Sequence, residues 1–341
     1  MTNKLLPDHP AVAIDTVPAP HQSLWRRALA WEGTGLLGVL VLVFIVLCFI
    51  APNFFTAANM LNILQQAAFF GIVAFAMTLV IVAGEIDVSV GSSAALTSSL
   101  VAYFVAKLDW PMWLSALIAI LIAVAMGAMI GWLRDALNVP TFIGTLALYL
   151  ALRGAAYLVT NTFPIPVESD KFFYWGSSTG KVFGIVPVPA LYFLAAFIVV
   201  ALIARYTVFG RSVYAVGGNA NASALSGVNV RRIRVLVMCG TAFAAAITGL
   251  LQTAQLASGN STIAQGLEFD AIAAAVIGGT AMSGGRGTIS GTLIGVLFVA
   301  ILLNGMVMLG LNPYVQQVVR GCLVLFAVLV NVARTRKTAA A

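Results

Sequence analysis

Four carboxylates interrupt otherwise apolar stretches of the chain, and they fall into two pairs. Glu85 and Asp87 are followed closely by Ser89, and Glu268 is followed by Asp270. Charged side chains at membrane depth are costly and face a cavity or a partner, so proton carriage and the lining of a polar path are the roles open to these groups. Residues two positions apart on a helix point about 200° away from each other. Glu268 and Asp270 therefore do not suit paired acid–base catalysis.

The histidines and cysteines exclude several other kinds of site. His9 and His21 are the only histidines, and both lie in a proline-rich N-terminal stretch. No serine–histidine dyad and no histidine-ligated zinc can then form within the membrane. The cysteines, Cys48, Cys239 and Cys322, lie singly inside apolar runs and offer neither a disulfide framework nor a metal-binding pair. We therefore expect no enzyme activity and no metal site.

One glycine-rich segment resembles a phosphate-binding loop. It reads Gly-Ser-Ser-Thr-Gly-Lys-Val over 176–182. The spacing is wrong and the final Ser/Thr of a Walker A loop is missing. We therefore expect no nucleotide or other cofactor on this chain.

The composition indicates a membrane protein. The chain has 341 residues, of which 61% are hydrophobic and 9% charged, with a mean hydropathy of +1.02, whereas soluble domains carry roughly 25% charged residues. The net charge of +7 does not indicate a nucleic-acid partner, because apolar runs separate the basic residues. The charge is better interpreted as a signal for orientation in the membrane.

Breaks at proline, glycine, asparagine and charged residues divide the chain into apolar segments long enough to cross a bilayer, which takes about 20 residues. The fold class predicted is all-α and polytopic, with about ten transmembrane helices within a permease domain at 31–333. A disordered cytosolic tail at 1–30 and a basic cytosolic tail at 334–341 flank this domain. The expected spans are approximately 34–51, 60–83, 89–107, 112–132, 140–160, 188–206, 233–257, 266–283, 288–309 and 313–333.

The distribution of Lys and Arg supports this count, because cytoplasmic loops hold the positive excess. With both termini cytoplasmic, only Lys107, Lys171 and Lys181 lie outside, and Arg153 and Arg320 fall within or near spans. The residues expected inside are Lys4, Arg26, Arg27, Arg134, Arg205, Arg211, Arg231, Arg232, Arg234, Arg286, Arg334, Arg336 and Lys337. The protein is accordingly placed in a cell membrane, in contact with lipid.

Two connections are long enough to carry function. The outer one, at about 161–187, contains the aromatic run Phe-Phe-Tyr-Trp at 172–175, and it is either a lid over helix ends or a docking surface for an external partner. In the inner one, Gly217 and Gly218 are expected to form a turn, Asn219 to cap a helix of two turns, and Gly227 to end it. So short a helix needs a surface to pack on, either its own membrane domain or a groove on a partner.

The order and spacing of five motifs resemble the permease subunits of bacterial ABC importers for sugars, in the ribose, xylose, arabinose and galactose branch. The resemblance extends over about 34–333. The motifs are Gly-Glu-Ile-Asp-Val-Ser-Val-Gly-Ser at 84–92, Pro-Thr-Phe-Ile-Gly-Thr-Leu at 140–146, Arg-Gly at 153–154 with Thr-Asn at 160–161, Ala-Val-Gly-Gly-Asn at 215–219 through Ser-Gly at 226–227, and Glu-Phe-Asp-Ala-Ile-Ala-Ala-Ala-Val-Ile-Gly-Gly-Thr at 268–280 with Gly-Gly-Arg-Gly at 284–287.

The resemblance implies a channel-forming permease in the bacterial inner membrane. Its partners would be a second permease subunit, identical or different, a periplasmic solute-binding protein and a cytosolic ABC ATPase subunit that holds ATP and magnesium. In that family the inner loop is the coupling helix that enters a groove of the ATPase, which corresponds to 217–227 here. The residues expected to couple are Gly217, Gly218, Asn219, Ala222, Leu225, Ser226 and Gly227.

The roles of the carboxylates stay open at the level of sequence. Either Asp87 or Ser89 caps the third span at the inner interface, or Glu85, Asp87 and Ser89 line the path near its inner mouth. The family usually has glycine where Glu85 stands, so a role for that carboxylate would be particular to this protein. Asp270 is expected as an acid in the first turn of span eight, at the outer face, with Glu268 on the outer mouth or at a docking surface.

Two other classes of function compete with an importer. An ion-coupled secondary transporter would use Glu85 or Asp87 as its proton carrier, although such folds place their site at mid-depth. A membrane enzyme or an assembly scaffold is disfavoured, because the membrane segments have no histidine and no acid pair at productive spacing.

Overall fold

The computed structural model describes residues 34–177 and 180–339. Over these residues the chain is a bundle of helices with two small two-stranded sheets. The helices are α2 (Thr34–Ile50), α3 (Ala57–Val82), α4 (Val90–Leu108), α5 (Met112–Ala136), α6 (Thr141–Thr160), α7 (Asp170–Gly176), α8 (Val188–Tyr206), α9 (Val208–Gly218), α10 (Ala220–Leu225), α11 (Val230–Leu256), α12 (Leu267–Ile277), α13 (Ile289–Met308) and α14 (Pro313–Ala339). The strands are β1 (Ile165–Pro166), β2 (Lys181–Val182), β3 (Val186–Pro187) and β4 (Ser258–Gly259).

The prediction of an all-α polytopic membrane protein is confirmed. Each of the ten predicted spans overlaps one helix, although α12 ends at Ile277, well before the predicted end at 283; the helices are α2, α3, α4, α5, α6, α8, α11, α12, α13 and α14. Among the described residues, α3, α5, α6, α8, α11 and α13 are long and apolar enough to cross a membrane on their own composition. The predicted tail at 1–30 lies outside the described residues, whereas α14 continues through the predicted basic tail as far as Ala339.

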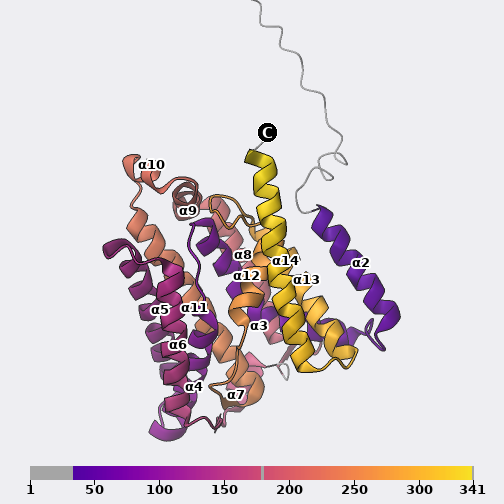
Figure 1. Cartoon of the computed structure of the whole chain (residues 1–341). Coiled ribbons are helices and arrows are strands. Elements are labelled where there is room, and N and C mark those ends of the chain that lie inside the picture. Colours follow the sequence, from indigo (N-terminus) through magenta and orange to yellow (C-terminus); the bar gives the residue numbers. More distant parts are fainter. Residues whose placement is uncertain (1–33, 178–179, 340–341) are drawn as a thin grey trace, which may run out of the picture.

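Both described ends of the chain lie at one end of the bundle. Figure 1 shows α9 and α10 at the same end as the first turn of α2 and the last turn of α14, with α7 at the opposite end. We call the end that holds α9 and α10 the inner end, since it carries the arginine-rich connection at 205–234 that the positive-inside rule places in the cytoplasm.

Helix α3 forms the centre of the bundle, and α8, α11, α12 and α13 pack around it. Its second half is buried throughout, whereas α8 exposes large aliphatic side chains such as Leu194 and Leu202. Helix α11 packs in turn on α5 and α4. A helix surrounded by protein and a helix that faces lipid can both be apolar all round, so the contacts rather than the hydropathy distinguish them.

Polar side chains connect α3 to α13 at two depths. Asn59 and Asn304 each donate to the other's side-chain oxygen at 3.0 Å, near the outer ends of the two helices. Thr78 and Thr292 share a hydrogen bond of 2.7 Å near the inner ends. All four side chains are buried. Hydrogen bonds between helices in a membrane contribute about 1 kcal/mol each. These bonds set the position of α3 along the length of α13.

The outer connection is mainly a lid. Strand β1 pairs with β4 antiparallel, with Ile165 opposite Gly259, and α7 packs on α11 and α8. Its aromatic run is nevertheless partly uncovered, since Tyr174 and Trp175 are exposed. Phe183, between β2 and β3, is 94% exposed. Whether these side chains also meet an external partner stays a prediction.

Candidate functional site

The first notable feature is a break between α3 and α4, where the chain is extended. Gly84 turns the chain with a φ of 80°. The backbone N–H groups of Ile86 and Val88 then point at the hydroxyl oxygens of Thr141 (3.4 Å) and Thr145 (3.3 Å) on α6. Irregular backbone at membrane depth is tolerated where protein satisfies its polar groups. The threonines of α6 supply the hydrogen-bond acceptors that these backbone N–H groups would have found within a regular helix.

Glu85 lies in this break at the inner end of the bundle. Its carboxylate oxygen Oε1 is 3.1 Å from Arg134 Nε on α5 and 2.8 Å from Arg234 Nε on α11. Thr141 donates to the other oxygen at 2.7 Å. Only 5% of Glu85 is exposed. The side chain therefore ties the first residues of the break to three helices.

Asp87 lies deeper and is also fully engaged. It accepts from the backbone N–H and the hydroxyl of Ser89, at 2.9 Å and 2.7 Å, and from the hydroxyl of Thr241 at 2.7 Å. Ser89 stands at the N-cap position of α4, as predicted, but its side chain accepts no capping hydrogen bond. Thr241 is seven residues beyond Arg234 on α11, so Asp87 bonds to that helix about two turns deeper in the bundle than the ion pair of Glu85.

We predict that Glu85→Gln destabilises the folded protein by roughly 3 kcal/mol, since removing one partner of a buried ion pair leaves the other charges uncompensated. The matched control is Asp135→Asn. Asp135 is 3.6 Å from Arg234, and its side chain is 31% exposed, so its loss should cost at most about 1 kcal/mol. Thermal unfolding of the detergent-solubilised protein measures both. Equal melting temperatures for Glu85→Gln and the unsubstituted protein would contradict the ion-pair role.

The second break precedes α12 and corrects our expectation for span eight. Helix α12 has 11 residues, which span about 16 Å and cannot cross a hydrocarbon core of about 30 Å. The chain before it descends along α4. Asn260 N–H donates to Ser98 Oγ at 3.1 Å, whereas the carbonyl of Ala264 lies against Gly91, seven residues earlier on α4.

Arg153 holds this descending segment in place. Its Nη1 donates to the carbonyls of Ser261 and Ile263, both at 2.8 Å. Arg153 is 7% exposed and projects from α6. A guanidinium presents several donors in a fixed plane, and here one nitrogen satisfies two carbonyls of the irregular segment.

We expected Glu268 and Asp270 at the outer face, but the structure places them inside the bundle. Glu268 is 2% exposed, and a Cβ atom on Gly91 would overlap its carboxylate, so it lies inside the protein where α4 begins and not on an outer mouth or docking surface. Asp270 is in the first turn of α12, as predicted. Its carboxylate is 3.5 Å from Arg320 Nη1 on α14.

The inner connection contains one more helix than we predicted. Gly217 and Gly218 form no turn and are the last two residues of α9. Asn219 caps α10 by accepting from Ala222 N at 2.9 Å, and Gly227 has a φ of 86°, both as predicted. Leu225, at the end of α10, is 92% exposed. The short helix protrudes from the bundle (Figure 1).

A glycine junction, which we define as Gly84, Gly217, Gly284 and Gly285, connects α9 to the break before α4 and to the connection between α12 and α13. Gly285 N–H donates to the Val82 carbonyl at 2.8 Å, at the end of α3. A Cβ on Gly217 would overlap the Val82 carbonyl oxygen and lie 2.7 Å from Gly285 N. These glycines therefore allow three stretches of backbone to pack in direct contact.

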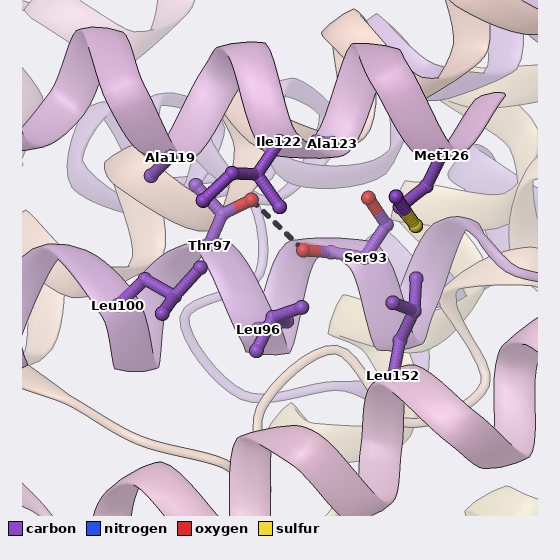
Figure 2. A pocket seen from close by; sticks show the side chains of 9 residues that line it. All are labelled: Ser93, Leu96, Thr97, Leu100, Ala119, Ile122, Ala123, Met126 and Leu152. Atoms are coloured by element: carbon purple, nitrogen blue, oxygen red, sulfur yellow. Dashed lines mark hydrogen bonds between the residues drawn. The ribbon is translucent and has the colours of Figure 1, made fainter. Parts of the chain in front are cut away.

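One hollow near the breaks is only a packing gap. Figure 2 shows it between α4 and α5, with Leu152 of α6 at its edge. It has no room for a water molecule. Thr97 donates to the carbonyl of Ser93 at 2.9 Å, so this hydroxyl stays within its own helix. The hollow is not part of a passage.

Comparison with known proteins places the chain in a family. Residues 59–328 match the family described as the permease component of the branched-chain amino acid transport system. The chain belongs to this family. No solved structure matches it. The permease is also similar, over most of its length, to curated proteins of Escherichia coli (strain K12).

Three of these relatives illustrate the similarity. A probable ABC transporter permease protein, YphD, is 46% identical over 90% of this permease and 91% of its own length. The ribose import permease protein RbsC is 40% identical over 90% of this permease and 95% of its own length. The xylose transport system permease protein XylH is 31% identical over 84% of this permease and 87% of its own length. The permease is accordingly a multi-pass inner-membrane transport subunit and not an enzyme.

Proposed function

We propose that this permease forms the membrane channel of an ATP-driven, binding-protein-dependent importer for a sugar or a similar small polar solute. The observation that carries the proposal is the similarity to the ribose and xylose permeases over at least 84% of the chain. Its partners are a cytosolic ABC ATPase that holds ATP and magnesium, a periplasmic solute-binding protein and a second permease subunit.

The segment 217–227 acts in this proposal as the coupling element. Helix α10 is too short to be stable alone, yet it projects from the bundle with Leu225 almost fully exposed. An exposed leucine beside the small side chains of Ala222 and Ser226 suits a narrow groove on an ATPase subunit. The glycine junction offers a route inward, since α9 extends from α10 to the break before α4 and to the connection between α12 and α13.

An ion-coupled carrier finds less support in the geometry. It would need a carboxylate that takes up and releases protons, and Glu85 or Asp87 would be that group. Glu85 is held by two guanidinium groups and a threonine hydroxyl, and Asp87 accepts three hydrogen bonds. Both groups instead stabilise the break in the chain.

The test is purification of the tagged permease from gently solubilised native membranes, followed by mass spectrometry and reconstitution of what is recovered. We expect a nucleotide-binding protein in stoichiometric amount, and sugar uptake that requires ATP and a binding protein. Recovery of the permease alone, with uptake that is sensitive to ionophores and independent of ATP, would overturn the proposal.

A further inference from the structure

A cavity of about 340 Å³ lies among α3, α11, α12, α13 and α14 in the outer half of the bundle. Its position follows from where its lining residues stand. Gln252 is four residues before the end of α11, and Gln316 is in the first turn of α14. Leu303 is in the last turns of α13. All three helix ends are outer ends.

The cavity has a closed floor and an open rim. Phe70, Leu267, Asp270 and Leu303 form the floor, and each is at most 8% exposed. Gln265, at the rim, is exposed. On the inner side of the floor, α12 packs against α13 with backbone contacts that leave no space for a Cβ on Gly278, Gly291 or Gly295. A solute could therefore enter from outside and would stop at the floor.

The polar lining is dominated by uncharged amides. Gln66, Gln252, Gln265 and Gln316 all contribute, from three helices and the segment before α12. An amide offers both donors and acceptors, as does each hydroxyl of a sugar. Gln316 Nε2 already donates to the Leu311 carbonyl at 2.9 Å, so this side chain offers its oxygen as an acceptor. Together the four amides can exchange hydrogen bonds with a ring of hydroxyls.

The charged and aromatic lining narrows the class of ligand further. Asp270 and Arg320 are 3.5 Å apart and compensate each other, so the cavity presents no free charge to hold the ammonium or the carboxylate of an amino acid. Phe69 and Phe70 add ring surface from α3, which suits the apolar face of a sugar ring. The volume corresponds to about ten water molecules, enough for one monosaccharide.

We infer that this cavity is a monosaccharide-binding site on the permease itself, in which Gln66, Gln252 and Gln316 exchange hydrogen bonds with the sugar hydroxyls. The inference rests on the proposed function for its substrate class, but it assigns to the membrane subunit a site of its own. A solute released from a binding protein waits here until the floor opens.

The experiment uses cysteine protection, which reports binding without requiring transport. Gln252→Cys is introduced after Cys48, Cys239 and Cys322 are replaced by alanine, and a membrane-impermeant methanethiosulfonate is added from outside to vesicles that contain the complex. The ligands are ribose, xylose and the sugar that the vesicles take up, with alanine and leucine for comparison. Gln255→Cys is the matched control, one turn further along α11 and outside the cavity.

We expect the transported sugar to slow modification of Gln252→Cys at least threefold and to leave Gln255→Cys unaffected. Adding Gln66→Leu should raise the sugar concentration for half-protection roughly tenfold, as loss of one hydrogen bond predicts. The neighbouring Gln65→Leu, whose side chain bonds to Gln255 instead, should not raise it.

The outcomes separate this inference from the proposed function. No protection by a sugar that the same vesicles import with ATP would overturn the inference and leave the proposed function standing. Protection by leucine or alanine instead would overturn the sugar class. Protection by sugar together with uptake independent of ATP would support the cavity and overturn the proposed function.

Discussion

Replacing Leu225 with arginine is expected to release the ATPase subunit from the permease while leaving the permease folded in the membrane. The side chain is 92% exposed, so the substitution should change the stability of the permease by at most about 0.5 kcal/mol. A buried apolar anchor at an interface contributes roughly 2 kcal/mol or more, and its loss weakens binding about 30-fold. The measurement is the ratio of ATPase to tagged permease after purification.

The matched control for this prediction is Phe183→Arg. Phe183 is 94% exposed and lies in the outer connection, so the same apolar-to-charged change is made at the opposite end of the bundle. It should leave the ATPase ratio unchanged. Gly218→Arg gives a second test on the inner side, since no heavy atom of the described residues lies within 4 Å of a Cβ at this position. Normal ATPase recovery and normal uptake with both inner variants would refute the coupling role of 217–227.

The apolar runs predicted most of the membrane helices because bilayer thickness sets their length. Span eight was predicted too long because the segment Gly-Gly-Thr-Ala-Met-Ser at 278–283 is nearly as apolar as a membrane-spanning helix. Gly279 in this segment and Gly284 directly after it have φ values of 95° and 85°, which are incompatible with a regular helix. Hydropathy records the composition of such a segment and not the backbone angles that only its neighbours in space require.

The depth of Glu268 could not be found from local sequence for a similar reason. The segment before it is rich in Ser, Asn, Thr and Gln, which is typical of an outer loop. It nevertheless enters the bundle, where Arg153, more than a hundred residues earlier, satisfies two of its carbonyls. An arginine in the apolar run of α6 was the available signal. The cavity residues likewise come from separate helices, and no spacing along the chain brings them together.

The glycine junction gives the sharpest contrast between neighbouring residues. Gly217→Ala places a methyl group onto the Val82 carbonyl oxygen and within 2.7 Å of Gly285 N. Both obstacles are backbone atoms, so no flexible side chain can move aside. Gly218→Ala meets nothing within 4 Å and exchanges a glycine at the end of a helix for the best helix former. The two variants differ by one position and should behave oppositely.

We expect Gly217→Ala to lower stability by about 1–3 kcal/mol, the usual cost of overpacking, and to abolish ATP-dependent uptake, because the hydrogen bond between Gly285 and Val82 cannot form at its present 2.8 Å. Gly218→Ala should retain both the stability and the ATP-dependent uptake of the unsubstituted permease. Melting temperature, ATPase recovery and uptake are measured on the same preparations. If Gly217→Ala retains the ATPase and hydrolyses ATP but transports nothing, the junction transmits the motion of α10. If it transports normally, α9 does not link α10 to the break before α4 and the connection after α12, since the backbone contact on which that link depends has been removed.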